Sequence, residues 1–243
     1  MRSLTKFRLI VLGLILVGAW FWYQQSRAWP MSVTFFSIGQ GDAALIKTPD
    51  RHTVLIDGGP DSSIIHKLGS ALPWTVRTID LVVLSHPHAD HLSGLIDVLK
   101  RYRVGRVLTS GVIHTTPEYL TWLKLIQDKH IPVIVARSGQ VFNIGSGATL
   151  SVLWPPISYE SQRVENVHVS TVVNRLQYES TSALFMGDAE ASTEQTLITT
   201  NPQLKSDILK VGHHGSRTSS TLEFIKAVSP QYAIISVGAK NRY

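Results

Sequence analysis

Four side chains that commonly bind metal ions fall within six residues, just after a short apolar segment. Residues 81–84 are all apolar and are typical of a buried strand, and a helical pattern begins near residue 91. Between them lie His86, His88, Asp90 and His91. Alternate side chains of an extended turn point the same way, so the first two residues are expected to face one metal and the last two a neighbouring metal. The sequence has no cysteine, so a metal here must be held by histidine and carboxylate.

After residue 30 the chain alternates short apolar runs with longer amphipathic segments. Strands are predicted at 32–38, 43–47, 53–57, 81–85, 106–109, 133–136, 149–154, 171–178, 183–186, 208–211 and 232–237. Helices are predicted at 62–71, 91–102, 117–129, 191–199 and 219–228. The first strands are separated only by turn signals, as in hairpins, whereas later strands alternate with helices. This order favours an α/β (α+β) fold of the αββα sandwich type over a doubly wound parallel sheet.

The N-terminal segment predicts a membrane anchor. Arg2, Lys6 and Arg8 precede an uncharged apolar and aromatic run at 9–23, and tryptophan and tyrosine gather at the far end of that run. This order favours one uncleaved transmembrane helix attached to the cytoplasmic membrane, with the following domain outside the cytoplasm. A cleaved signal peptide, giving a secreted domain, and a buried core helix are the alternatives. The expected division is an anchor and linker at 1–29 and one domain at 30–243.

The net charge does not by itself indicate a nucleic-acid-binding surface. The formal charge is +6, but residues 1–27 hold four basic residues and no acidic one, so the predicted domain is nearly balanced.

At the His86–His91 segment the sequence resembles the metallo-β-lactamase superfamily, whose signature is His-x-His-x-Asp-His. All four signature positions match. Three other segments fit the superfamily in the same order: a strand and Asp-Gly turn at 53–59, a strand and Gly-Asp turn at 185–188, and a late histidine motif at 211–216. The resemblance implies an αββα sandwich with a dinuclear metal site.

A narrower resemblance is to the C-terminal metallo-β-lactamase-like domain of the ComEC competence proteins. It rests on segments 36–43, 186–190, 213–216 and 236–243 and covers about residues 31–243. The multi-pass channel of ComEC has no counterpart here, so an uptake channel is not implied. In that subgroup Asn-x-Tyr is usually followed by Gly-His-Pro, whereas this sequence stops at Tyr243, so the last histidine of the motif is absent and a truncated domain is one of two open alternatives.

The superfamily resemblance implies two divalent cations, zinc or manganese, and iron is also compatible with these ligands. His86 and His88 would hold one cation. His168 would complete that group, or else would be a surface histidine at a strand end, because ComEC domains often have an Asn/Ser-rich stretch there. Asp188 would bridge the two cations.

The second cation would be held by Asp90, His91 and His213, again as the resemblance implies. Asp90, Asp188 and His214 are the residues expected to act in catalysis.

Four further residues have open interpretations. Asp57 would orient a ligating histidine or serve its Asp-Gly-Gly turn, and Asp42 would belong to the site or to a hairpin turn. Ser216 and His214 would contact a substrate phosphate or donate a proton. The remaining histidines have no ligand spacing and are expected outside the site: His52, His66, His114 and His130.

Three functions fit these features. The first is a metal-dependent phosphodiesterase or nuclease that acts on DNA outside the membrane, with single-stranded DNA as a candidate partner. The second is a hydrolase of another ester, a lactone, an amide or a β-lactam. The third is a non-catalytic domain that binds DNA or a protein partner. The sequence leaves the metal, the substrate and the oligomeric state open.

Overall fold

Two six-stranded sheets face each other in a computed structural model that describes residues 2–26, 28–201 and 203–239. The first sheet has the order β1-β2-β3-β4-β5-β6. Its strands are β1 (Ser32–Phe35), β2 (Ala44–Lys47), β3 (Thr53–Ile56), β4 (Thr78–Leu84), β5 (Arg103–Thr109) and β6 (Val133–Val135). The pairs β1·β2 and β2·β3 are antiparallel, and the pairs from β3 to β6 are parallel.

The second sheet has the order β12-β11-β10-β9-β8-β7. Its strands are β7 (Val141–Gly145), β8 (Ala148–Trp154), β9 (Val173–Tyr178), β10 (Thr181–Phe185), β11 (Ile208–Lys210) and β12 (Tyr232–Ile234). Pairs from β7 to β10 are antiparallel, and β10·β11 and β11·β12 are parallel.

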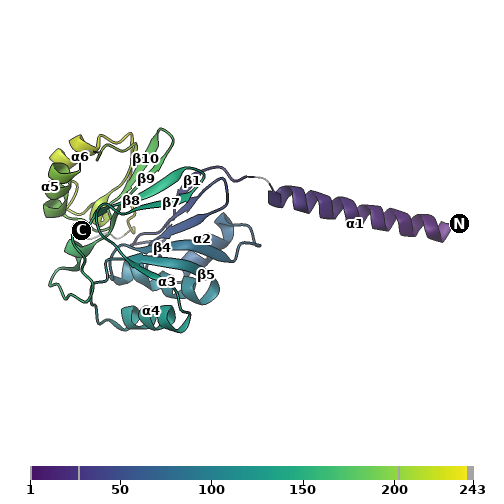
Figure 1. Cartoon of the computed structure of the whole chain (residues 1–243), viewed down its shortest axis with the longest axis horizontal. Coiled ribbons are helices and arrows are strands. Elements are labelled where there is room, and N and C mark those ends of the chain that lie inside the picture. Colours follow the sequence, from purple (N-terminus) through teal and green to yellow (C-terminus); the bar gives the residue numbers. More distant parts are fainter. Residues whose placement is uncertain (1, 27, 202, 240–243) are drawn as a thin grey trace.

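Helices cover the outer faces of both sheets (Figure 1). The described helices are α1 (Arg2–Ser26), α2 (Ser63–Ala71), α3 (Ala89–Arg101), α4 (Pro117–Asp128), α5 (Ala191–Thr200) and α6 (Leu222–Val228), with single 3-10 turns η1 (Val167–Ser170) and η2 (Gly212–Gly215). The helices α2, α3 and α4 lie beside the first sheet, and α5 and α6 lie beside the second (Figure 1). The predicted αββα sandwich is therefore confirmed.

Three apolar layers hold the sandwich together, and strand alternation creates them. In β2 and β3, Leu45 and Leu55 face the core shared with the helices, whereas Ile46 and Val54 face the core between the sheets. A third core joins the second sheet to α5 and α6. The central strands of the first sheet are covered on both faces, which explains why they appear in the sequence as unbroken apolar runs.

The N-terminal segment forms the 25-residue helix α1, which extends away from the sandwich in Figure 1. Within the described part of the chain, no helix combines the length and the apolar character that crossing a membrane requires. The predicted transmembrane helix is therefore not supported.

Sequence patterns missed one strand, β7. Its five residues include Asn143 and end at Gly145, both of which are unfavourable in strands. They are extended because they pair with β8. The similarity at 236–243 falls partly outside the described residues, which exclude 240–243.

Helix α3 packs tightly on the turn that follows β3. An added Cβ at Gly94 would collide with the Gly58 carbonyl oxygen and lie 2.8 Å from the Asp61 carbonyl oxygen. The amide of Gly58 donates to the carbonyl of His91 at 2.8 Å. This close approach brings the helix that carries two predicted ligands against the turn that begins with Asp57.

We expect Gly94→Ala to destabilise the domain by about 1–3 kcal/mol, because the new methyl must displace backbone atoms. Gly69 of α2 is the matched control, since a Cβ there meets no atom within 4 Å. Gly69→Ala should be neutral or stabilise by up to about 1 kcal/mol. Urea unfolding of both variants measures the difference, and equal stabilities would show that α3 can move away from the turn at no cost.

Candidate metal centre

The candidate ligands gather where four strands end. In the first sheet β3 and β4 are parallel and end at Ile56 and Leu84, so Asp57 and the segment from Ser85 onward emerge at one edge. His88 occupies the N-cap position of α3, which places the next two candidate ligands, Asp90 and His91, in the first turn of the helix.

The second sheet supplies the other half in the same way. The strands β10 and β11 are parallel and end at Phe185 and Lys210, so their following turns lie side by side. One turn carries Asp188, and the other, η2, carries two adjacent histidines. The amide of His213 donates to the carbonyl of Gly187 at 3.0 Å and links these two turns. His168 lies in η1, just before β9.

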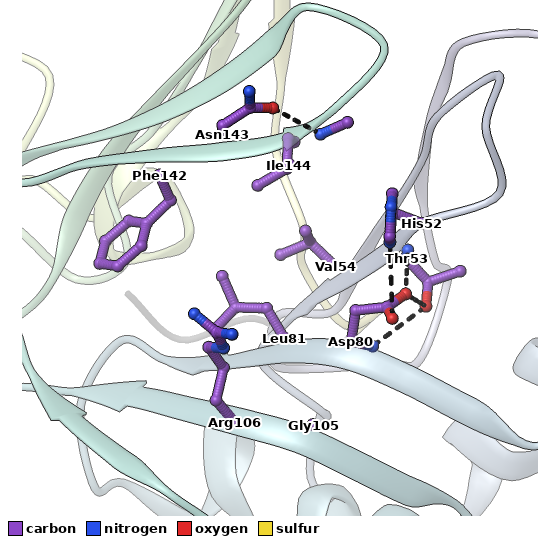
Figure 2. A pocket seen from close by; sticks show the side chains of 11 residues that line it. His52, Thr53, Val54, Asp80, Leu81, Gly105, Arg106, Phe142, Asn143 and Ile144 are labelled. Atoms are coloured by element: carbon purple, nitrogen blue, oxygen red, sulfur yellow. Dashed lines mark hydrogen bonds and ion pairs between the residues drawn. The ribbon is translucent and has the colours of Figure 1, made fainter.

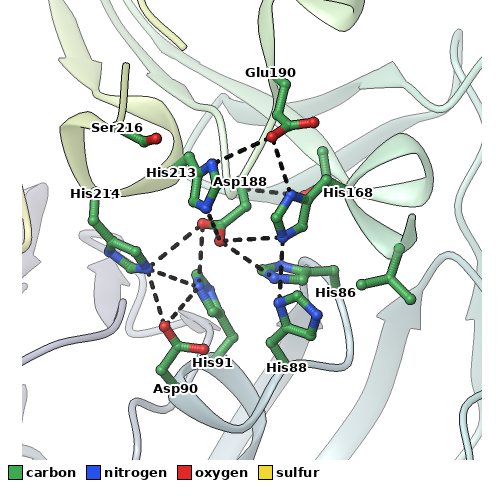
Figure 3. A network of polar contacts seen from close by, with 12 residues as sticks. His86, His88, Asp90, His91, His168, Asp188, Glu190, His213, His214 and Ser216 are labelled. Carbon is green, nitrogen blue, oxygen red and sulfur yellow. Dashed lines mark hydrogen bonds and ion pairs between the residues drawn. The ribbon is translucent and has the colours of Figure 1, made fainter. Parts of the chain in front are cut away.

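Asp188 lies at the middle of the cluster and is 2% exposed. Its Oδ1 is 3.2 Å from His91 Nε2 and 3.7 Å from His214 Nε2. Its Oδ2 is 3.5 Å from His86 Nε2 and 3.8 Å from His168 Nε2. The two oxygens thus face different sets of imidazoles, as a bridging carboxylate would (Figure 3).

Among the described residues, five overlapping groups of donor atoms, each within 4.8 Å of one another, have the composition of metal sites, and two of them share no residue and hold most of the predicted ligands. The first group consists of His86, His88, His168 and Asp188, and the second of Asp90, His91 and His214. The structure therefore brings the predicted first ligand set together, including His168.

The second group differs from the predicted ligand set, because His214 takes the place assigned to His213. His214 Nε2 lies 3.1 Å from Asp90 Oδ2 and 3.3 Å from His91 Nε2. His213 lies on the other side of Asp188, where its ring is 4.5 Å from that of His168. Both η2 histidines have left-handed backbones, with φ of 47° and 54°. This unusual turn directs the two adjacent rings to opposite sides.

The donor atoms fit divalent cations. Two ligands of one tetrahedral zinc ion lie about 3.3 Å apart, close to the separations around Asp188. The ring nitrogen Nε2 of His86 is buried and makes no hydrogen bond to any described residue, although Asp188 Oδ2 is near. A buried imidazole nitrogen left in this way costs free energy unless it binds something, and a cation would satisfy it.

Electrostatics keep the central carboxylate ionised and one imidazole neutral. Burial works to raise the pKa of Asp188, but His91 and His86 outweigh it and hold the pKa well below its usual range. Burial lowers the pKa of His86 well below 6.5. Burial also works to lower the pKa of His91, but Asp188 and Asp57 together raise it well above that value. Metal binding must displace such protons, so we expect cation affinity to fall in acid.

Two of the predicted surrounding residues contact the second group. Asp57 Oδ2 lies 2.8 Å from His91 Nδ1, and burial raises the pKa of Asp57 although His91 opposes this. Asp42 Oδ1 lies 3.5 Å from His214 Nδ1. Burial works to lower the pKa of His214, but Asp42 and Asp90 raise it to about 9.

The Ser216 side chain contacts a residue of its own loop. Its hydroxyl is 3.2 Å from that of Thr218, which in turn is 2.9 Å from His213 Nδ1. Its predicted contact with substrate stays a prediction.

Sequence patterns missed three residues around the centre. Glu190 Oε1 lies 3.5 Å from Nδ1 of both His168 and His213. Ser85 contacts Asp57 and His86, and the ring of His114 is 6.4 Å from that of His88. Of the three, only His114 could have been expected near the centre from its position in the sequence. It follows β5, which is parallel to β4, so both strands end at the same edge of the sheet.

A separate pocket lies at the other end of the sandwich. It is lined by Thr53 and Asp80, near the starts of β3 and β4, by Arg106 in the middle of β5, and by Phe142 and Ile144 of β7 (Figure 2). The candidate ligands follow the ends of β3 and β4, so this pocket is not part of the metal centre.

Two neighbouring groups of histidine and aspartate, at one edge of an αββα sandwich, fit the class of proteins of this fold that typically bind two divalent cations. A family model described as the metallo-beta-lactamase superfamily matches residues 37–159. The chain belongs to this superfamily, whose members are usually metal-dependent hydrolases.

Two of the curated relatives are proteins of the ComEC type. The chain is 29% identical over 233 residues to ComE operon protein 3 of Bacillus subtilis, covering 87% of this chain and 29% of that protein. It is 30% identical over 217 residues to competence protein ComA of Neisseria gonorrhoeae, covering 87% of this chain and 28% of that protein. The chain thus spans less than a third of these relatives, and the resemblance to ComEC-type proteins is confirmed.

Solved structures support the fold alone. The metallo-beta-lactamase fold protein YhfI of Bacillus subtilis aligns with a TM-score of 0.54 at 17% identity, covering 87% of this chain and 88% of that one. CmlA, a diiron beta-hydroxylase of Streptomyces venezuelae, aligns with a TM-score of 0.52 at 15% identity, covering 84% and 44%.

Proposed function

We propose that this chain is a dinuclear metal-dependent phosphodiesterase that cuts nucleic acid, in a role related to competence. The observation that carries the proposal is the position of Asp188, with one oxygen toward each ligand group. Two-metal sites of this kind suit in-line displacement at phosphorus, since bound cations lower the pKa of water and stabilise the attacking and leaving oxygens. The ComEC-type relatives, one of which is named competence protein ComA, favour DNA as the substrate.

The residues of the chain would hold and orient this centre. His86, His88 and His168 would bind one cation, and Asp90, His91 and His214 would bind the other. Zinc and manganese both suit these ligands.

Substrate would approach from the partly open side of the centre. Asp90, Glu190 and His168 have side chains 26%, 24% and 13% exposed, whereas His86 and His91 are fully buried. A polymer can reach an exposed rim of this kind.

Cleavage assays test the proposal. The 243-residue chain, loaded with Mn²⁺ or Zn²⁺, should cut single-stranded DNA and bis-p-nitrophenyl phosphate, and chelation with EDTA should abolish both activities. Opening of a lactone or a β-lactam without phosphodiester cleavage would instead favour the second class of hydrolase. DNA binding without bound metal or cleavage would favour a non-catalytic domain.

A further inference from the structure

Ser85 is the residue between β4 and the first histidine ligand, and it is 1% exposed. Its hydroxyl oxygen lies 2.7 Å from Asp57 Oδ2, 3.1 Å from His86 Nδ1 and, at a longer distance, 3.3 Å from His91 Nδ1. Its backbone amide also donates to Asp57 Oδ1 at 2.7 Å. One serine therefore joins a buried carboxylate to an imidazole of the first ligand group.

The chemistry of these groups gives the contacts a direction. Asp57 accepts the hydroxyl proton of Ser85, so the lone pairs of the hydroxyl are left to accept from His86 Nδ1–H. A neutral histidine that carries its proton on Nδ1 has its lone pair on Nε2. In His86 that nitrogen faces Asp188, so the contact with Ser85 selects the tautomer that can bind a cation there.

The same carboxylate acts on the second group directly. Asp57 Oδ2 lies 2.8 Å from His91 Nδ1, which leaves His91 Nε2 facing Asp188 Oδ1 at 3.2 Å. Asp57 thus contacts one ligand group itself and reaches the other through Ser85.

Packing fixes Ser85 between the two halves of the centre. Its carbonyl accepts from the amide of Val172, the residue just before β9 of the second sheet, at 2.8 Å. A Cβ added to Gly187 would lie 2.9 Å from Ser85 Cβ, so the turn that carries Asp188 packs directly on this serine. The hydroxyl has little freedom to leave its place between Asp57 and His86.

We propose that Ser85 is a positioning residue. Asp57 orients the imidazole of His91 by direct contact and that of His86 through the Ser85 hydroxyl, so that one buried carboxylate orients an imidazole in each metal site. This inference rests on the proposed dinuclear centre but not on its substrate.

Cation binding by the whole chain tests the proposal. Zn²⁺ titration, with Co²⁺ absorption to report ligand geometry, should show that Ser85→Ala weakens one of two sites by about 10–100-fold. The other site should change less than about threefold, since the contact of His91 Nδ1 with Asp57, at 2.8 Å, is shorter than its contact with Ser85, at 3.3 Å, and remains in the variant. Asp57→Asn should weaken both sites.

Ser206→Ala is the matched control. Ser206 is also 1% exposed, but its hydroxyl donates to the carbonyl of Leu204 and accepts from Arg175. It precedes β11, whereas the histidine turn η2 follows the other end of that strand. This variant should bind both cations as the wild type does. Equal weakening of both sites by Ser85→Ala, or unchanged binding at both, would overturn the proposal.

The wild-type chain offers a second test that does not depend on folding of a variant. Nitrogen-15 NMR of the His86 ring should show the proton on Nδ1 and not on Nε2. The opposite tautomer would refute the proposed role of Ser85. A wild type that binds two cations but cuts no phosphodiester leaves this test intact, so failure of the proposed function is distinguishable. A wild type that binds no cation would overturn both.

Discussion

Asp188→Ala is expected to lower hydrolytic activity by about 1000-fold and to reduce cation binding from two ions to one or none. The loss follows from geometry, because each oxygen of Asp188 faces a different ligand group. Bound cations contribute several kcal/mol of transition-state stabilisation, and each 1.4 kcal/mol is a factor of ten in rate. Metal analysis of the purified variant, together with its cleavage rate, measures both effects.

A surface carboxylate provides the control for this experiment. Asp97 lies on α3 and contacts Lys100 at 3.2 Å on the surface. Asp97→Ala should keep both cations and the wild-type rate. Two bound cations and full activity in Asp188→Ala would contradict the bridge.

Lys210→Met is expected to destabilise the fold by about 3–5 kcal/mol, because it leaves the buried carboxylate of Asp42 without the ammonium group that neutralises its charge. Lys210 Nζ lies 2.7 Å from Asp42 Oδ2, with the two side chains 5% and 7% exposed. Nζ also donates to the carbonyl of Val211 at 2.8 Å. Urea unfolding at neutral pH measures the loss.

The pH dependence of this ion pair has a definite sign. Burial works to raise the pKa of Asp42, but Lys210 and His214 outweigh it and lower the pKa to about 2. A depressed pKa contributes stability in full above the unfolded value of 3.8, and this contribution is lost as the pH falls toward 2. Lys210→Met should show a weaker loss across that range.

Two variants sharpen the test of the buried pair. Asp42→Asn combined with Lys210→Met should cost less than Lys210→Met alone, since no unpaired charge is left buried. Lys100→Met removes an ion pair whose lysine side chain is 53% exposed, and should change stability by less than about 1 kcal/mol. Similar losses in the two single lysine variants would show that burial of the Asp42–Lys210 pair carries no special cost.

Asp42 and Asp57 show which contacts of the site could not be predicted from the spacing of residues in the sequence. Asp57 begins an Asp-Gly-Gly turn and Asp42 lies at a predicted hairpin turn. For each residue, the sequence left both a role in the site and a role in the turn open. The fold places both near the centre, with Asp57 against His91 and Asp42 against His214. Neither contact follows from local sequence, because the partners are 34 and 172 positions apart.

The sequence by itself determined the αββα layering, most strand and helix positions, and the four candidate ligands at 86–91. Those features depend on the alternation of apolar residues and on donors close together in the chain. The tertiary structure alone decided that His214, and not His213, joins Asp90, and that Ser85 and Glu190 contact the ligands. The reason is physical: a left-handed turn and the packing of two sheets set the directions of those side chains, and neither leaves a pattern in nearby residues.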